Sequence, residues 1–531
     1  MNNPQQLVDI FQFDAQDQEN LKVVYEQFNQ GVSALRTLIE SEPVVLHCGL
    51  SGKDSSVVVL MAVEAYRQSI QAGLVEPSRP LLVVTVDTGA EAIALKMYVH
   101  YVRKRLLEFG KQIGINLCYD IIQPPINDQY FIKYTGGQKL VPSVTRHQDC
   151  SIILKIDPSE RYIKQAIKKY SECSCYKLVS CVGSRIAESH HRAGNMKKQG
   201  LSLITAGSIL ADMAQVEAAG SKMYKLAPIK HWETEQVFDL LRIAGSNPIK
   251  RVPGIVIDTY LTNFGLLLEL YGNGSNEVCD IIVGQKNSGC GGKARFGCVT
   301  CTLVGKTDNS ATGLSKLPRW NALGSENALR VRDYLWRLSN DMDARALHAR
   351  AYDPVTYNRV ALQPNTLKPK YLEKMVRYAA QLTLDSIRIA KEFAELVANG
   401  REIEHEGYRD IANDPNIPPK TKRLFLEMYR EWAQDPKSLN YLFDEAQSLL
   451  LSFRWSIDGI GAAPFRPYAI FKQLESGHGW IPYPKLNSEM DDTSTQVNQT
   501  LPEAVMMPIL KSEVAEDFAK HPVNLLERSG R

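Results

Sequence analysis

The sequence predicts an α/β protein: a parallel twisted sheet with helices on both faces, followed by a mainly α-helical C-terminal region. Two observations support this prediction. The first half of the 531-residue chain alternates short apolar runs, rich in β-branched residues, with longer segments of helical period. From about residue 321 to 450, apolar residues recur at helical spacing almost throughout, between turn signals such as Ala398-Asn399-Gly400.

The apolar runs and helical segments of the first half give definite element boundaries. Strands are expected at residues 44–48, 81–87, 115–122 and 176–183. Helices are expected at residues 55–71, 90–114, 159–170, 234–244 and 256–271, with Thr234 capping the fourth.

The same pattern divides the chain into four segments. We expect an N-terminal helical segment at 1–42, a sheet domain at 43–271, a Cys-rich loop at 272–318, and a helical C-terminal domain at 319–531 with an irregular tail. The loop is rich in Gly, Ser and Asn and is too polar to form a packed core. Something other than hydrophobic burial must therefore order it.

Composition excludes several classes of protein. The chain has 62 Lys and Arg against 59 Asp and Glu, a net charge of +3 and 44% apolar residues, as in an ordinary globular protein. It contains no run of about 18 uncharged apolar residues and no signal-peptide pattern at its start. We therefore expect a cytoplasmic protein without a membrane partner.

All ten cysteines lie between Cys48 and Cys301. In a reducing compartment they are expected to be thiols or ligands rather than disulfides. Cys48, Cys118 and Cys181 fall in apolar strands, which is typical of buried structural thiols.

The balanced total charge hides an uneven distribution. Residues 133–304 contain 22 Lys and Arg against 14 Asp and Glu, whereas residues 305–531 contain 30 of each. The basic excess coincides with the Cys-rich loop, and this favours a phosphate backbone as a second ligand, bound in a salt-dependent way. The basic residues singled out there are Arg185, Arg192, Lys197, Lys198, Lys250, Arg251, Lys293 and Arg295.

A candidate phosphate loop joins the first predicted strand to the first helix of the sheet domain. It reads Gly49-Leu-Ser-Gly-Lys-Asp-Ser-Ser56. Such a loop directs successive N–H groups at one point, where the helix dipole also favours an anion. Lys53 adds a positive charge, and Asp54 with the nearby hydroxyls could hold magnesium. A simple helix cap is the alternative; the spacing is not that of a Walker A motif.

This segment resembles the PP-loop, Ser-Gly-Gly-Lys-Asp-Ser, of the adenine nucleotide alpha hydrolase-like superfamily, which includes ATP pyrophosphatases and PAPS reductases. Its members are known for cleaving ATP between the α and β phosphates. Leu50 and Ser51 stand where the family has Ser and its first Gly. The resemblance implies catalytic roles for Lys53 and Asp54, and an ATP site that includes Leu50, Ser51, Gly52, Lys53, Asp54, Ser55 and Ser56.

Four further segments resemble the same family in the same order. They are the Asp-Thr-Gly of 83–91, the stretch 146–158 that begins at Arg146, the Gly-x-Arg-x-x-Glu-Ser of 182–192, and the Pro-Ile-x-x-Trp of 226–241. The resemblance implies that Arg185 is catalytic. It adds to the ATP site Asp87, Thr88, Gly183, Arg185, Glu188 and Arg192.

The Cys-rich loop contains Cys290 and the pair Cys298-x-x-Cys301. A Cys-x-x-Cys pair places two thiolates on one turn, within reach of one metal ion or cluster edge. Reduced structural thiols are one alternative, and a zinc site with Cys279 is another. A 4Fe-4S cluster fits better, because Cys150 could complete a set of four ligands. Whether Cys150 or Cys279 is the fourth ligand stays open.

The stretch 294–302 and the overall length resemble the DndC and SspD sulfurtransferases of DNA phosphorothioation systems. The resemblance implies an ATP pyrophosphatase that uses magnesium and adenylates a DNA backbone phosphate, so that sulfur replaces a nonbridging oxygen, in modification linked to phage defence. It also implies a catalytic Cys150, a cysteine desulfurase as sulfur donor, and further subunits of the modification complex.

Two other functions are consistent with the same residues. One is a PP-loop tRNA thiolase, since no residue distinguishes DNA from RNA. The other is a noncatalytic assembly subunit with an altered loop. Sulfonucleotide reduction is disfavoured, because those reductases use a cysteine near the C-terminus and no cysteine follows Cys301.

Overall fold

The first half of the chain forms a five-stranded parallel sheet in the order β3-β2-β1-β4-β5. The computed structural model describes residues 4–134, 136–143, 149–172, 176–188, 223–274, 298–303, 305–352, 359–458, 466–486, 489 and 505–508. The strands are β1 Val44–Gly49, β2 Leu81–Val86, β3 Leu117–Ile122, β4 Lys177–Cys181 and β5 Met223–Leu226. The four predicted strands are confirmed. The fifth was missed because Met-Tyr-Lys-Leu is short and carries a central charge.

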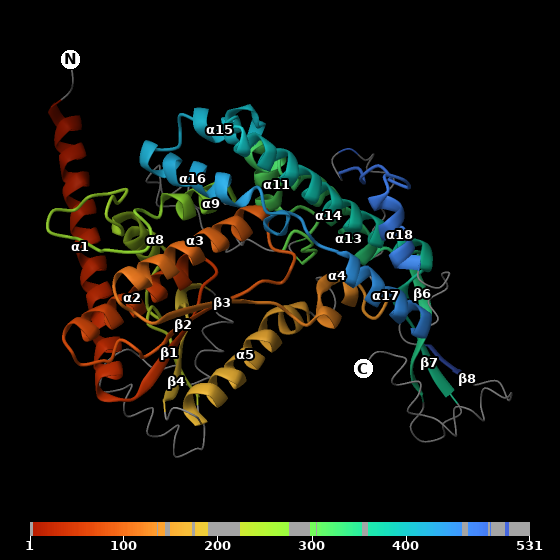
Figure 1. The fold of residues 1–531 in the computed structure, drawn as a ribbon, viewed down its shortest axis with the longest axis horizontal. Coiled ribbons are helices and arrows are strands. Elements are labelled where there is room, and N and C mark those ends of the chain that lie inside the picture. Colours follow the sequence, from red (N-terminus) through yellow and green to blue (C-terminus); the bar gives the residue numbers. More distant parts are fainter. Residues whose placement is uncertain are drawn as a thin grey trace.

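Helices cover both faces of this sheet, as predicted (Figure 1). Because successive side chains of a strand point to opposite faces of the sheet, β1 contributes side chains to two separate apolar cores. Val44, Leu46 and Cys48 pack into the large core with the helices of one face, whereas Val45 lies in a smaller cluster with Ala166 of α5 on the other face. The helices of this half are α1 Pro4–Ser41, α2 Lys53–Gln71, α3 Ile93–Gln112, α4 Tyr130–Lys133, α5 Asp157–Ile167, α8 Thr234–Ile243 and α9 Gly265–Gly274.

The C-terminal region is mainly helical, as predicted. Its helices are α11 Asn309–Lys316, α12 Pro318–Asn321, α13 Ser325–Asn340, α14 Pro369–Ala398, α15 Glu406–Asn413, α16 Pro419–Trp432, α17 Glu445–Asp458 and α18 Arg466–Glu475. It also contains an antiparallel sheet, β6-β7-β8, made of Arg345–Tyr352, Arg359–Leu367 and Val505–Pro508. The prediction of near-continuous helix was therefore wrong at β6 and β7, and the tail predicted to be irregular contains α18.

The two halves share one hydrophobic core. The large cluster of buried residues extends from Leu21 in α1 to Leu439, which follows α16. At the same boundary Lys96 of α3 is buried, and its ammonium donates to the backbone carbonyl of Leu439 at 3.0 Å. Tyr101 of α3 donates to Glu427 of α16 at 3.1 Å. The helical half is thus packed directly against the helices of the sheet half.

Two local predictions were wrong. The helix expected at 256–271 begins only at Gly265, because Pro253 and Gly254 open an irregular stretch in which Gly254 has a left-handed backbone. Glu233, not Thr234, caps α8, and the Glu233 amide donates to the side-chain oxygen of Gln236 at 2.7 Å. The Thr234 hydroxyl instead accepts a hydrogen bond from Arg185.

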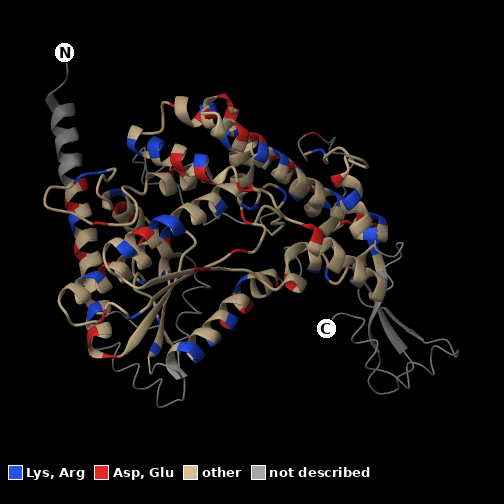
Figure 2. Cartoon of the chain, viewed as in Figure 1, with Lys and Arg blue, Asp and Glu red and all other residues tan. Residues whose placement is uncertain are grey.

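Charged residues of both signs are spread along the helices (Figure 2). None of the described helices is both long enough and apolar enough to cross a membrane. Along α5 and the residues just past its end, the exposed basic residues are Arg161, Lys164, Lys168 and Lys169, and the acidic Glu160 is exposed beside them.

Candidate nucleotide site and cysteine turn

The candidate phosphate loop lies at the carboxyl edge of the sheet, where β1 has β2 on one side and β4 on the other. This is the topological switch point at which open α/β sheets bind ligands. The loop leaves β1 and enters α2, and Gly183 leaves β4 beside it. A Cβ atom on Gly183 would lie 3.0 Å from the backbone carbon of Asp54 and the amide nitrogen of Ser55. Glycine at 183 therefore lets the two chain segments meet.

Hydrogen bonds fix the loop to the sheet and to its own helix. The Leu50 amide donates to Val84 at 2.8 Å, and the Leu50 side chain is buried in the core. The hydroxyl of Ser55 accepts from the amides of Ser51 and Gly52, each at 2.9 Å. Ser56 is fully buried, and its hydroxyl donates back to the Gly52 carbonyl at 2.9 Å. Among the hydroxyls of the loop, Ser51 and Ser55 therefore lie nearest its open side.

Asp54 joins two cations that the sequence had singled out. Its carboxylate accepts from the Lys53 ammonium at 3.3 Å and from the Arg185 guanidinium at 2.5 Å. The Arg185 side chain is only 1% exposed, so this pair is held away from water. The structure thus brings Lys53, Asp54 and Arg185 together.

Arg185 also ties the loop to a distant segment. Its guanidinium donates to the carbonyl of Trp232 and to the hydroxyl of Thr234, both at 3.2 Å. Those residues belong to the Pro-Ile-x-x-Trp segment, which precedes α8. Three of the family-like segments therefore converge on one buried guanidinium.

Residues 44–250 match the family model of the phosphoadenosine phosphosulfate (PAPS) reductase domain. These residues form a PAPS reductase-like domain. No curated protein matches the chain. The domain includes all five parallel strands, and members of the PAPS reductase family are enzymes. The matched residues end before α9 and before the cysteine turn, so both lie outside what the family model describes.

The end of β2 connects the PAPS reductase domain to the cysteine turn. Asp87 accepts from the Gly89 amide at 2.8 Å and from Gln123 at 2.7 Å, which fixes the turn. Thr88 is buried, and its hydroxyl lies 3.4 Å from the Cys298 sulfur. The Val299 amide donates to the Ala90 carbonyl at 2.6 Å. The Asp-Thr-Gly segment and the Cys-x-x-Cys pair are therefore in direct contact.

Cys298 and Cys301 lie on one tight turn. The Cys301 amide donates to the Cys298 carbonyl at 2.9 Å. Arg332 of α13 is fully buried and donates to the Cys301 carbonyl at 2.8 Å, and it also binds the carbonyls of Gly305 and Lys306. The Arg332 guanidinium thus holds the backbone after the turn in place. This agrees with the expectation that something other than hydrophobic burial orders this polar segment.

Cys150 lies in the same region as this turn. Cys150 and Cys298 both pack against the second apolar cluster, and Tyr130 interacts electrostatically with the three thiols of Cys150, Cys298 and Cys301. Burial, and next the charge of Glu91, raise the pKa of Cys298 to about 12. Burial, and next Cys301, raise the pKa of Cys150. Without a ligand, both sulfurs are therefore thiols at neutral pH.

Thiolates are the usual ligands of an iron-sulfur cluster, and Cys150, Cys298 and Cys301 all interact electrostatically with Tyr130. No three His, Cys, Asp or Glu side chains of the described residues are grouped tightly enough to hold one metal ion. Cys279 and Cys290 lie outside the described residues, as do Cys173 and Cys175. Cys150, Cys298 and Cys301 are thus the described members of the predicted ligand set, and they lie in the same region of the structure without forming a metal-binding group.

Several other predicted site residues lie outside the described part of the chain. Arg146 and Arg192 lie outside the described residues, and only the backbone of Glu188 is described. The basic residues Lys197, Lys198, Lys293 and Arg295 also lie outside. Of the rest, Lys250 pairs with Asp17 at 2.5 Å and Arg251 is exposed.

The structure adds contacts that sequence reasoning did not assign. Lys155 pairs with Glu91 at 3.3 Å, close to Cys298. Both residues belong to motif segments, Glu91 to 83–91 and Lys155 to 146–158, although the sequence reasoning assigned them no role. Tyr130, Arg332 and Tyr271 had no such signal, because a tyrosine or arginine in a helical segment is ordinarily part of a core or a surface.

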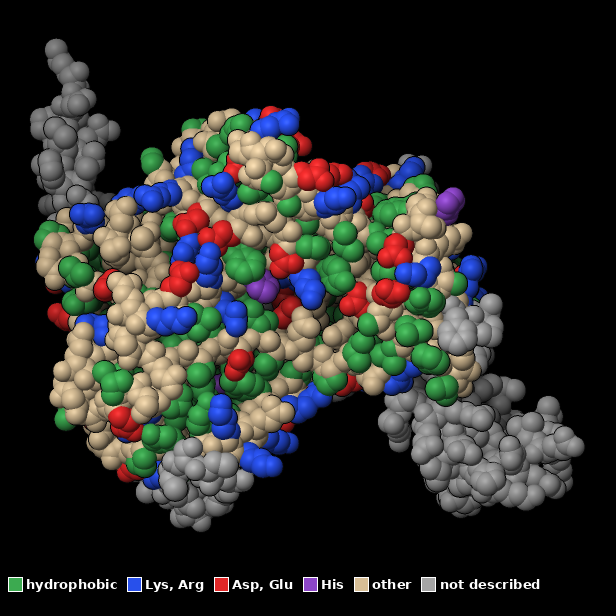
Figure 3. All heavy atoms as spheres, in the orientation of Figure 1, with side chains coloured by type: hydrophobic (Ala, Val, Ile, Leu, Met, Phe, Trp, Pro, Cys, Tyr) green, Lys and Arg blue, Asp and Glu red, His purple; other side chains and the backbone are tan. Residues whose placement is uncertain are grey.

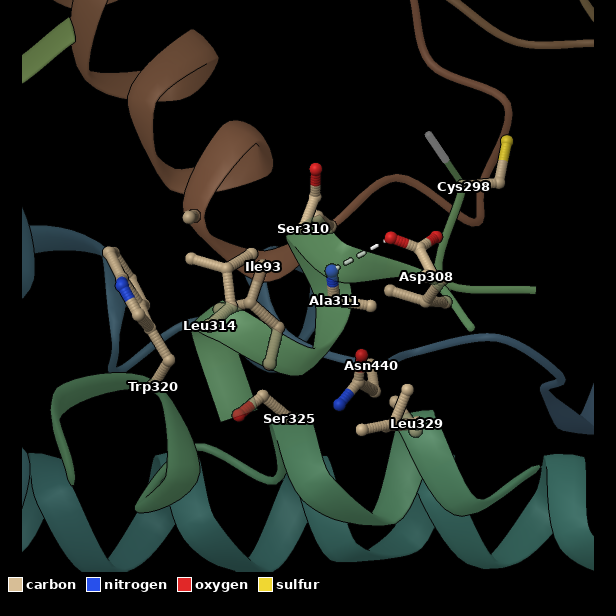
Figure 4. Close-up of a pocket in the computed structure, with 14 residues that line it drawn as sticks. Ile93, Cys298, Asp308, Ser310, Ala311, Leu314, Trp320, Ser325, Leu329 and Asn440 are labelled. Carbon is tan, nitrogen blue, oxygen red and sulfur yellow. Dashed lines mark hydrogen bonds between the residues drawn. The ribbon is translucent and has the colours of Figure 1, made fainter. Parts of the chain in front are cut away.

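An apolar pocket adjoins the cysteine turn (Figure 4). Cys298 lies at one end and Trp320 at the other, with Ile93, Leu314 and Leu329 between them. The pocket is lined by the start of α3, by α11 and by α13. The surroundings of Cys298 are therefore completed by the C-terminal half of the chain.

Proposed function

We propose that this protein is an ATP pyrophosphatase and sulfurtransferase that activates a DNA backbone phosphate by adenylation, so that sulfur replaces a nonbridging oxygen. One observation supports it above the others. The phosphate loop and the cysteine turn lie at the same edge of the sheet, and Thr88 contacts Cys298 directly. An activation site beside a thiol site is what such a reaction needs.

The chemistry of the exchange explains why ATP is required. Oxide is a very poor leaving group, so the target oxygen must first be converted into a better one. The oxygen attacks the α phosphorus of ATP, the bond to the β-phosphate bridging oxygen breaks, and pyrophosphate leaves. Lys53 and the loop amides stabilise the charge that develops on pyrophosphate. Asp54 and the loop hydroxyls provide oxygen ligands for magnesium, which would spread that charge further.

The cysteines supply the sulfur side of the reaction. Cys150, Cys298 and Cys301, with Cys290 or Cys279, would hold a 4Fe-4S cluster, which when bound supplies a redox-active sulfur-rich centre. Sulfur would come from a cysteine desulfurase partner, as part of a modification complex. Thr88 and Tyr130 hold the cysteine segment against the PAPS reductase domain: Thr88 contacts the Cys298 sulfur, and Tyr130 donates to the Thr300 carbonyl at 3.4 Å.

A phosphate backbone also fits the surface beside the cysteines. Helix α5 follows Cys150 in the chain after one π-helical turn, Ile152–Ile156. Arg161 and Lys164 are exposed on α5 beside Glu160, Lys168 is exposed just past its end, and Figure 3 shows several basic side chains along the lower edge of the molecule. Such a strip binds phosphates without reading bases.

The decisive experiment measures pyrophosphate release from ATP by cluster-loaded protein in the presence of DNA. We expect wild-type protein to release pyrophosphate and Lys53→Ala to lose at least a hundredfold in rate, on the order of the effect of removing one preorganised electrostatic group. Lys391→Ala, on the exposed side of α14, is the matched control and should behave as wild type. Equal background rates for wild type and Lys53→Ala would refute the catalytic proposal and favour a noncatalytic assembly subunit.

A second experiment tests the cluster. Protein purified without oxygen should be brown and contain about four irons per chain, and Cys298→Ser with Cys301→Ser should be colourless. Cys118→Ser, in β3, is the matched control and should keep the colour. A colourless wild-type preparation with one zinc would refute the cluster.

A further inference from the structure

The hydroxyl of Tyr271, near the end of α9, lies at the mouth of the phosphate loop. It accepts a hydrogen bond from the Lys53 amide at 3.4 Å. It also lies so close to Gly52 that a Cβ atom built there would be 2.3 Å from the tyrosine oxygen. The approach is therefore possible only because residue 52 has no side chain.

The first amides of the loop all have partners inside the protein. Those of Ser51 and Gly52 donate to the Ser55 hydroxyl, and that of Lys53 donates to Tyr271. A phosphate bound in such a loop needs the same N–H groups. A phosphate therefore has to displace these oxygens before it can bind.

Tyr271 also holds the charged group of the loop. The Lys53 ammonium lies 5.3 Å from the centre of the Tyr271 ring and 5.6 Å from that of Phe238, a distance at which a cation is attracted to an aromatic face. The Lys53 side chain is only 12% exposed. One tyrosine thus engages both the amide and the ammonium of the residue expected to contact phosphate.

We propose that Tyr271 is a gate of the phosphate loop, whose hydroxyl occupies a phosphate-oxygen position and leaves when a polyphosphate binds. The proposal rests on the proposed function in one respect, that this loop binds the phosphates of ATP. Helix α9 packs against α11 and α16, so the movement is passed to the C-terminal helices. Tyr271 lies outside the residues matched by the PAPS reductase domain model, which end at residue 250.

The first test measures binding of inorganic pyrophosphate and of α,β-methylene-ATP, which cannot be cleaved at the reacting bond, by calorimetry. Tyr271→Phe keeps the ring and removes the hydroxyl, so both ligands should bind roughly two- to tenfold more tightly, as expected for removing one competing hydrogen bond. Tyr468→Phe, whose hydroxyl binds Glu445 on the surface, is the matched control and should bind as wild type.

The outcomes separate the gate from the proposed function. If wild type binds pyrophosphate through Lys53 while Tyr271→Phe binds it equally or more weakly, the gate is refuted and the proposed function stands. If neither wild type nor Tyr271→Phe binds either ligand, the proposed function is refuted, and the gate with it.

A second test needs no nucleotide. Gly52 has an extended backbone, with φ of −167°, which alanine adopts without strain. Any loss of stability in Gly52→Ala should therefore arise from a clash between the new Cβ atom and the Tyr271 hydroxyl. The next nearest atom, the ring carbon Cζ of Tyr271, would be 3.6 Å from that Cβ, which is an ordinary contact. In urea denaturation, Gly52→Ala should lower the midpoint in wild type but not in Tyr271→Phe. Equal effects of Gly52→Ala in both backgrounds would refute the contact on which the gate depends.

Discussion

The hydroxyl of Thr88 lies 3.4 Å from the sulfur of Cys298, although 209 residues separate them in the sequence. Thr88 also donates to Glu91 at 3.1 Å and accepts from the Ala90 amide at 3.3 Å. One buried hydroxyl thus holds the turn after β2 and contacts the cysteine turn. The edge of the sheet and the cysteine segment are parts of one structure.

Replacing Thr88 with valine should destabilise the protein by about 1–3 kcal/mol, because the shape is kept while buried hydrogen-bonding partners lose the hydroxyl. The free energy of unfolding in urea measures this. Thr37→Val is the control, since that hydroxyl binds the Ser33 carbonyl within its own helix near the surface, and a change of less than about 0.5 kcal/mol is expected there. Equal losses at the two positions would contradict the role assigned to Thr88.

Replacing Asp54 with asparagine should destabilise the protein by about 3 kcal/mol, because the buried Arg185 guanidinium loses its counter-charge. Urea denaturation measures the loss. Glu108→Gln removes the partner of Arg105 in an exposed pair and should leave stability unchanged within error. If Asp54→Asn were as stable as wild type, the Asp54–Arg185 pair could not be the link that holds the loop against β4.

The free energy of unfolding should decrease as the pH is lowered, partly because of His47 on β1. Burial lowers the pKa of His47 to about 4, below its ordinary value of about 6.5. Above pH 6.5 the side chain is neutral in both folded and unfolded chains. Between pH 6.5 and 4 the unfolded chain takes up a proton that the folded one does not, so up to about 3 kcal/mol of stability is lost as pH falls through this window.

The test of His47 compares unfolding free energies at pH 7.5 and 4.5. His47→Gln should lose less stability between these values than wild type does. His405→Gln is the matched comparison, since burial lowers the pKa of His405 to about 4 as well, and that variant should retain the contribution of His47. Identical pH dependence in wild type and His47→Gln would contradict the prediction.

Removing the exposed Lys164 of α5 and Lys168 just past its end should weaken binding of DNA of any sequence. Each lysine that neutralises one phosphate contributes about one unit to the slope of log affinity against log salt concentration, so the double alanine variant should lose about two units. Fluorescence anisotropy over a salt series measures the slope. Lys391→Ala with Lys437→Ala, on other exposed surfaces, should leave it unchanged.

The parallel sheet could be predicted from the sequence because its strands are buried on both faces. β1 and β2 are therefore nearly continuous apolar runs, and β4 is buried from Leu178 to Cys181. β5 escaped prediction because four residues with a central lysine carry too little pattern. β6 and β7 also escaped prediction, because the spacing of apolar residues in that region was interpreted as helical.

The candidate site was predictable where a motif placed reactive side chains at a strand end. Lys53, Asp54 and Arg185 converge because the ends of β1 and β4 are neighbours. Tyr271 was not predictable in the same way, since its role depends on how α9 lies against the loop. That position follows from tertiary packing rather than from local sequence.

The buried contact between Lys96 and the carbonyl of Leu439 has a consequence for how the molecule can be divided. The family match ends at residue 250, yet the core around the sheet includes Phe264, Trp320 and Phe425 from beyond it. A chain cut at that boundary would leave the Lys96 ammonium with only the more distant Gly89 carbonyl, at 3.4 Å, and would expose the apolar side of α3. The inherited module and the cooperative unit of folding are therefore different sets of residues, and the module depends on the later half of the chain for its own stability.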